Sequence, residues 1–210
     1  MSEPVHHAPD AMLASLAAGS LPYPFAALLA AHVSLCDECR SRLDAHRVLG
    51  GLVLDELSPV GLAPNARDRA LAEIEAARPT AAAEPRGGYP APLPGFVGPD
   101  GPHWRSLGFG AKQAMLWSGP SGTLRMLLIP AGQAVPEHGH RGLELTLVLS
   151  GAFSDATGHF RAGDLEVADE ALGHTPHATD DAPCICVAAT DAPLRFRAMI
   201  PRLLQPLFRI

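Results

Sequence analysis

The sequence predicts two domains, an all-α unit followed by an all-β jelly-roll barrel. Composition changes near residue 79: before it the chain is rich in Ala and Leu at helical spacing, and after it short alternating runs are separated by Gly, Pro and Asp. Between them, residues 79–95 read PTAAAEPRGGYPAPLPG, the composition of a semi-extended linker. We therefore expect a helical domain over residues 1–78, a linker over 79–95 and a β domain over 96–210.

Helical periodicity supports the first domain. Asp10 suits the N-cap of the first helix, and Gly19 and Pro22 end that helix. The longest helix carries an apolar stripe that includes Leu43 and Leu49. The predicted helices span residues 10–18, 24–31, 36–57 and 64–77.

Short strands fill the second domain. The alternation of Leu143, Leu145, Leu147 and Leu149 has the period of a strand that buries one face. Many short strands separated by turn residues favour a sandwich or small barrel, and at this length we predict a jelly roll. The predicted strands span residues 124–129, 143–149, 164–168, 184–189 and 194–199, and the apolar tail 201–210 is expected to dock on the barrel.

The overall composition excludes several classes of protein. Hydrophobic residues make up 47% of the chain and charged residues 18%, which excludes global disorder. The net charge of −6 argues against direct nucleic-acid binding, because DNA-binding surfaces need clustered positive charge. Residues 1–10 lack the features of a signal peptide, and the longest apolar stretch, residues 25–35, reaches about half of a membrane span. We expect a cytoplasmic protein that does not bind membranes.

A metal-ligating pattern lies in the helical domain. His32, Cys36 and Cys39 stand at relative positions 0, +4 and +7, which would place them on one face of a helix. Thiolate and neutral imidazole suit zinc, and a fourth ligand would close a tetrahedral structural site. His6 or His7 supplies it if the first helix packs back on this one. The alternatives are buried cysteines without a metal and a redox Cys-x-x-Cys pair, whose usual βαβ context is missing here.

A second ligand set lies in the β domain. Residues 132–151, GQAVPEHGHRGLELTLVLSG, match the first sequence motif of cupin barrels without a gap. His138, His140 and Glu144 all have even numbers, so an extended chain would turn them to the same side, the barrel interior. Some cupin barrels keep such residues without binding a metal, which is the alternative here.

The second cupin motif is looser. It begins at Gly163, and His174 follows eleven residues later, where the last metal ligand of this motif stands; His177 is the rival ligand. Three imidazoles and one carboxylate suit Zn, Fe, Mn or Ni. Cys184 and Cys186 face the same way on a predicted strand, either as buried small hydrophobes or as a redox-sensitive pair near the barrel metal.

As a whole, the chain resembles the ChrR-type zinc-binding anti-sigma factors. The likeness covers essentially the whole length and rests on HHAPDAMLASLAAGSL, AHVSLCDECR, GQAVPEHGHRGLELTLVLSGAF and APLRFRAMIPRLLQPLFRI. It implies that the helical domain binds an extracytoplasmic-function sigma factor and keeps it from RNA polymerase. It also implies that the cupin domain is needed to release the sigma factor under oxidative stress such as singlet oxygen. The implied zinc ligands are His7, His32, Cys36 and Cys39 in the first site and His138, His140, Glu144 and His174 in the second.

Two hypotheses about function follow. The first is a transcriptional regulator, a zinc-dependent anti-sigma factor without catalytic residues. The rival is a metal-dependent cupin dioxygenase or isomerase, with Arg125, Arg141 and Glu166 as its charged candidates. The enzyme leaves the amino-terminal metal site without a role, so we predict the regulator. Apolar residues that would form either its partner surface or its core are Leu13, Leu16, Leu28, Leu29, Val48, Leu49 and Leu52.

Overall fold

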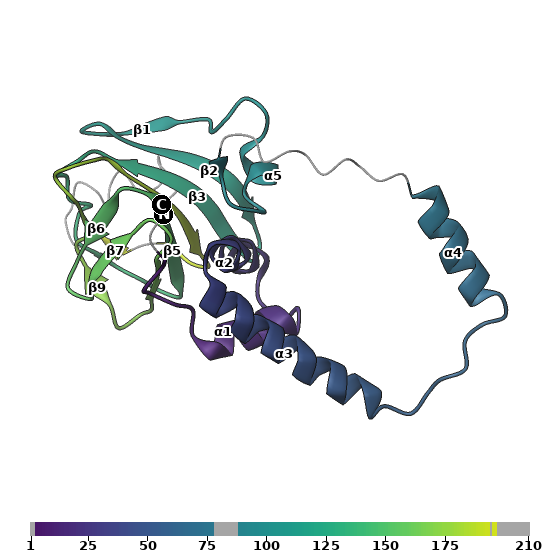
Figure 1. Ribbon diagram of the computed structural model, residues 1–210. Helices are drawn as coiled ribbons and strands as arrows, with labels where there is room; N and C mark the ends of the chain where they lie inside the picture. Colours follow the sequence, from purple (N-terminus) through teal and green to yellow (C-terminus); the bar gives the residue numbers. More distant parts are fainter. Residues whose placement is uncertain (1–2, 78–87, 194, 197–210) are drawn as a thin grey trace.

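The computed structural model describes residues 3–77, 88–193 and 195–196, and confirms a helical unit followed by a β barrel (Figure 1). Most of the predicted linker, part of the predicted strand at 194–199 and the whole apolar tail lie outside the described residues. The domain boundaries at 78 and 95 stay a prediction. No helix in the described ranges is long and apolar enough to cross a membrane. The helices are α1 Asp10–Ala17, α2 Tyr23–Leu35, α3 Asp37–Asp55, α4 Ala66–Ala76 and α5 Pro94–Val97.

Local chemistry sets the ends of the first helices. Gly19 follows α1 with a φ of +66°, a conformation that glycine adopts without strain. Pro22 precedes α2, and Cys36 separates α2 from α3 with extended backbone angles (φ −115°, ψ 110°). The Cys36 thiol then accepts a hydrogen bond from the Cys39 amide and caps α3. The prediction of one continuous helical face for His32, Cys36 and Cys39 is therefore wrong, because the helix breaks between them.

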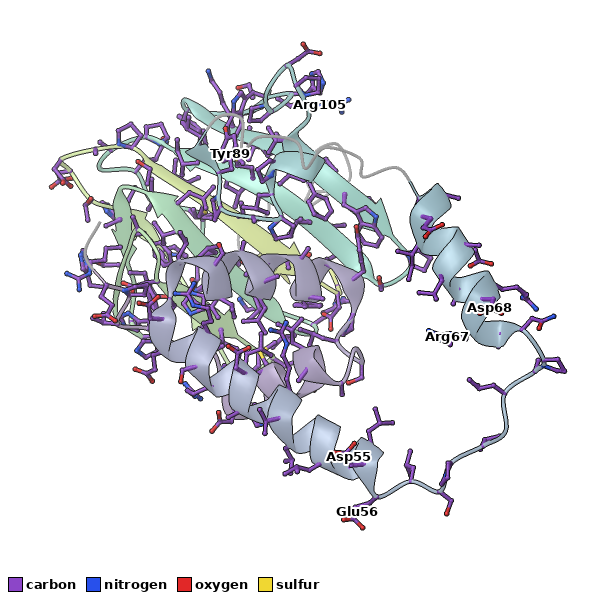
Figure 2. The ribbon with its side chains drawn as sticks, turned by 45° about the vertical axis from the view of Figure 1, so that its right-hand side comes forward. Asp55, Glu56, Arg67, Asp68, Tyr89 and Arg105 are labelled. Carbon is purple, nitrogen blue, oxygen red and sulfur yellow. The ribbon has the colours of Figure 1, made fainter. Side chains whose placement is uncertain are left out.

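The second half of α3 has little to pack against. Cys39 and Leu43 are its only buried residues in the described chain, both near its start. Figure 1 shows α3 projecting past α1, and Figure 2 shows Asp55 and Glu56 at its far end. Helix α4 buries none of its residues within the described ranges, and stands away from the body of the molecule.

Antiparallel strands form the barrel. The main sheet has the order β1-β2-β3-β11-β5-β8, and two smaller sheets have the orders β10-β6-β7 and β12-β4-β9. Strand β11 lies between β3 and β5, so that Cys186 pairs with Leu127 on one side and Val148 on the other. The strands of the main sheet are β1 Arg105–Gly108, β2 Ala111–Gly119, β3 Gly122–Ile129, β5 Glu144–Ser150, β8 Leu165–Ala168 and β11 Cys184–Thr190. Those of the smaller sheets are β4 His138–Gly139, β6 Ala152–Ser154, β7 His159–Arg161, β9 Gly173–His174, β10 His177–Ala178 and β12 Arg195–Phe196.

Alternation along the central strands gives the main sheet two different faces. On one face, Leu145 and Leu147 are fully buried in the same hydrophobic cluster as Leu28 and Leu29 of α2. Helix α2 contacts β3, β5 and β11, so it covers this face. The other face lines the barrel interior, with side chains from Leu127, Ile129, Thr146, Cys184 and Cys186. The helices and the barrel thus share one core.

The last part of the predicted linker belongs to this core as well. Leu93 is fully buried, and Val97 of α5 is nearly so. Tyr89 and Phe96 pack against the same cluster. Residues 89–97 therefore attach to the barrel, although a proline-rich composition suggested a spacer.

Candidate metal centres

Four side chains of the helical unit converge at one point. The Nδ1 atom of His7 lies 3.3 Å from the Sγ of Cys36 and 3.8 Å from that of Cys39. The Nε2 atom of His32 lies 3.3 Å from the Sγ of Cys39. Nitrogen and sulfur ligands of a tetrahedral zinc ion stand about 3.5 Å apart, given its usual bond lengths. We call these four residues the first centre; their spacing suits a metal ion.

Each ligand comes from a different part of the chain. His7 precedes α1, His32 lies in the last turn of α2, Cys36 joins the two helices, and Cys39 begins α3. The amide of Ala8 donates to the Sγ of Cys39 at 3.4 Å, and the amide of Cys39 donates to the Sγ of Cys36 at 3.4 Å. Such amide donors stabilise thiolate charge, as a metal site requires.

Outer partners orient both imidazoles of the first centre. The Nδ1 atom of His32 lies 2.9 Å from the carbonyl oxygen of Gly163, which only accepts, so Nδ1 donates and Nε2 keeps its lone pair. The Nε2 atom of His7 lies 3.2 Å from the Glu38 carboxylate, which leaves Nδ1 to face the thiols. Burial lowers the pKa of His32 and so favours the neutral form that binds metals.

The choice between His6 and His7, which the spacing left open, has a structural basis. His6 points away from the thiols: its Nδ1 atom lies 3.4 Å from the Asp164 carboxylate, and its ring packs 4.4 Å from that of Phe160. Only His7 of the two belongs to the four-residue cluster. The geometry therefore favours His7 as the fourth ligand.

A second cluster lies inside the barrel. The Nε2 atom of His174 lies 3.1 Å from that of His138 and 3.3 Å from that of His140. Imidazole nitrogens bound to one ion at zinc-like distances stand about 2.9–3.4 Å apart. All three side chains are buried. We call this group the second centre; His177 is exposed and lies outside it, which favours His174 over its rival.

Glu144 lies beside the second centre rather than within the three-atom group. One of its oxygens, Oε2, lies 3.4 Å from Nδ1 of His140, the ring nitrogen opposite the cluster. His138 and Glu144 line the same pocket, as the even numbering predicted, although β4 and β5 belong to different sheets. That oxygen is buried and makes no hydrogen bond, so an ion or water in the pocket would satisfy it. Burial opposes ionisation, but the three imidazoles outweigh it and lower the pKa of Glu144.

Two further carboxylates contact His174 at Nδ1, the ring nitrogen that faces away from the second centre. The Nδ1 atom of His174 lies 2.6 Å from the Asp155 carboxylate and 3.3 Å from that of Glu166. Hydrogen bonds, chiefly from Thr157, outweigh burial and lower the pKa of Asp155 to about 2. Carboxylates in this position fix the ring and make it a better ligand. The sequence analysis missed Asp155, because its partner lies on a distant strand and no motif joins the two residues.

The second centre opens into a mostly apolar pocket of the barrel. Leu127, Ile129 and Phe153 line it, together with both cysteines of β11. Cys184 and Cys186 are buried free thiols. The hydrogen bond to Cys184 and burial both raise the pKa of Cys186. A redox role for the pair stays a prediction.

Comparison with known proteins gives consistent matches. Residues 96–192 match the ChrR cupin-like domain family. Over 211 aligned residues the chain is 50% identical to the anti-sigma-E factor ChrR of Cereibacter sphaeroides, and 98% of each chain is covered. The crystal structure of Rhodobacter sphaeroides SigE in complex with the anti-sigma ChrR superposes with a TM-score of 0.76 and 47% identity, covering 89% of this chain and 98% of that one.

Metal affinity of the first centre should rise with pH. Burial raises the pKa of Cys39 to about 11, so at neutral pH the metal-free thiol carries a proton that a metal ion must displace. Displacement of the Cys39 proton by itself should make the apparent metal affinity rise about tenfold per pH unit between about pH 6 and pH 8. Competition with a chromogenic chelator measures the affinity. An affinity that is independent of pH would contradict thiolate ligation.

His140→Ala should empty the second centre and leave the first one loaded. It removes one of three converging nitrogens, and so should lower the metal content by about one ion per chain. Elemental analysis of the gel-filtered protein measures this content. His103→Ala is the matched control, because His103 is exposed and lies outside both centres. Equal metal content in the two variants would exclude His140 as a ligand.

Proposed function

The chain belongs to the ChrR family of anti-sigma factors, and we propose on this basis that it binds and inhibits an extracytoplasmic-function sigma factor. One observation carries the proposal. The first centre lies at the start of α3, and this helix has an exposed apolar face farther along. In this reading the protein is a transcriptional regulator, and its contact with nucleic acid is indirect, through the sigma factor. A cytoplasmic location is part of the proposal, since that is where sigma factors meet RNA polymerase.

The surface we assign to the sigma factor is the apolar face of α3. Val48, Leu49, Leu52 and Val53 are each between 58% and 64% exposed. Their spacing of one and four residues places them together on one side of the helix. Monomeric proteins rarely leave such a row of large apolar side chains in water, so a protein partner accounts for it.

The remaining candidates from the sequence belong to the core. Leu13, Leu28 and Leu29 are fully buried, and Leu16 packs at the edge of the same cluster. Helical periodicity gave no means of separating the two groups, because α1, α2 and α3 are all rich in apolar side chains. What separates them is that α3 extends beyond the helices that cover its first turns (Figure 1).

We propose zinc for the first centre. Two thiolates and two imidazoles at tetrahedral spacing suit that ion, and when bound it would tie the segment before α1 to the α2–α3 junction. Small helical units gain much of their folding free energy from such an ion. The direction of α3, and with it the position of the apolar face, would then depend on the first centre.

For the second centre we propose zinc or another divalent metal, held by His138, His140 and His174 with Glu144 alongside. Its role would be to release the sigma factor under oxidative stress such as singlet oxygen. Support comes from the thiols of Cys184 and Cys186, which line the same pocket, so that oxidisable groups and the metal ligands stand together.

The pocket gives little support to the alternative of a dioxygenase or isomerase. Arg125 and Arg141, the two cationic candidates, are absent from its lining within the described chain. Its two carboxylates, Glu144 and Glu166, already face His140 and His174.

Co-expression of the full chain with the sigma factor encoded next to it tests the proposal. The full chain is required because the helices share their core with the barrel. We expect one stable complex in size-exclusion chromatography, with zinc in the fraction that contains both proteins. A folded, zinc-loaded chain that elutes apart from the sigma factor would contradict the proposal.

Charge on the apolar face of α3 should weaken sigma-factor binding strongly without unfolding the protein. Leu49→Glu or Leu52→Glu would bury an unpaired carboxylate in the interface, and we expect affinity to fall about 30-fold or more. Calorimetric titration measures the affinity, and the thermal midpoint should stay close to that of the parent, since both residues are exposed. Phe109→Glu is the control, because Phe109 is 93% exposed on the barrel. Equal losses in all three variants would rule out this surface.

A further inference from the structure

The turn between β7 and β8, residues 161–165, reaches from the barrel to the first centre. We call it the bridging turn. Its Gly163 carbonyl accepts the hydrogen bond from His32. Its Asp164 carboxylate accepts two backbone hydrogen bonds from the segment that carries His7: from Val5 at 2.7 Å and from His6 at 3.0 Å.

Further contacts align the amino-terminal segment with the bridging turn. The Leu165 amide donates to the carbonyl of His6 at 3.3 Å. Gly163 has a φ of +98°, and a Cβ atom there would lie only 2.9 Å from the ring of Pro4. Glycine is therefore required both by the backbone conformation and by the close approach of the segment.

Asp164 makes hydrogen bonds within its own turn and also to the amino-terminal segment. Its amide donates to the Arg161 carbonyl at 2.8 Å, which closes the turn, and its Oδ2 atom accepts the Arg161 amide at 2.9 Å. The bonds to Val5 and His6 join residues 159 and 158 positions away, respectively, and are not part of the turn itself. Asp164 is fully buried by these contacts. Two ligands of the first centre, His32 and His7, are thus positioned by barrel residues.

The residues that follow the bridging turn contact a ligand of the second centre. Glu166, the second residue of β8, lies 3.3 Å from Nδ1 of His174. Only Leu165, buried in the core shared with the helices, separates Asp164 from Glu166. The backbone between the two carboxylates is extended and pairs with β5 from Leu165 onward, so the two carboxylates are joined by a continuous, packed stretch of chain.

We propose that the bridging turn couples the two metal centres. Gly163 and Asp164 position His32 and His7 for the first ion, and Glu166 links their placement to that of His174 at the second. Loss of the second ion then changes how firmly the first one is held. This inference rests on the metal sites of the proposed function, and specifies how its regulation passes from the barrel to the helices.

The first test measures how fast the first centre loses its metal. The full chain is loaded with Co²⁺, whose thiolate charge-transfer absorption reports only the first centre, since the second-centre cluster contains no sulfur ligand. On addition of EDTA, Asp164→Ala should lose this absorption about 10–100 times faster than the parent. Asp169→Ala is the matched control: Asp169 also caps a turn, through the Ala171 amide, but is exposed. Equal rates in the parent and in Asp164→Ala would overturn the positioning role.

A second variant controls for the possibility that Asp164→Ala disturbs the folding of the barrel. His6→Ala leaves every barrel residue in place and removes only the ring contacts with Asp164 and Phe160. We expect a smaller rise in the release rate, in the same direction. An unchanged rate in His6→Ala, together with a misfolded barrel in Asp164→Ala, would also overturn the proposal.

A double-mutant cycle tests the coupling itself. His140→Ala, which disables the second centre, should change the release rate at the first centre at least about threefold, and this change should vanish when Asp164→Ala is also present. Independent effects that simply multiply would overturn the coupling. No sigma factor takes part in these measurements, so failure to bind one has no effect on their outcome.

Discussion

The imidazole of His32 joins the two halves of the molecule. One ring nitrogen faces the Cys39 thiol at 3.3 Å, and the other donates to the Gly163 carbonyl at 2.9 Å. Because a carbonyl only accepts, the barrel fixes the tautomer that the first centre needs. His32 also lies on α2, the helix that covers the main sheet. A single side chain therefore connects the ligand geometry, the placement of α2 on the barrel and the start of α3.

The main sheet serves both halves because its two faces differ. Leu145 and Leu147 point to the helices, while their neighbour Thr146 lines the pocket of the second centre. Only one layer of strands separates the helical core from the second centre. The coupling proposed above would therefore need no large movement, since tightly packed layers transmit small displacements. It also explains why the chain folds around a shared core rather than as two separate bodies.

The sequence alone predicted the fold class and most of the candidate ligands. Cysteine and histidine residues at these spacings come together in space even where the local structure differs from the expected one. His32, Cys36 and Cys39 meet although the helix breaks at Cys36. What the sequence could not supply were relations between distant segments. His7 is favoured over His6 because Asp164 and Phe160 hold His6 elsewhere, and Asp155 supports His174 from the turn between β6 and β7. The apolar face of α3 likewise depends on where neighbouring helices end.

The most direct test is the affinity of the full chain for the sigma factor encoded next to it, before and after removal of the zinc proposed for the first centre. Calorimetric titration of both forms, followed by re-addition of zinc, makes the comparison within one preparation. We expect binding to be lost with the ion and to return with it, because the ion would fix the α2–α3 junction from which the apolar face of α3 projects. Undiminished binding by the zinc-free chain would show that the first centre is not needed to present the apolar face of α3.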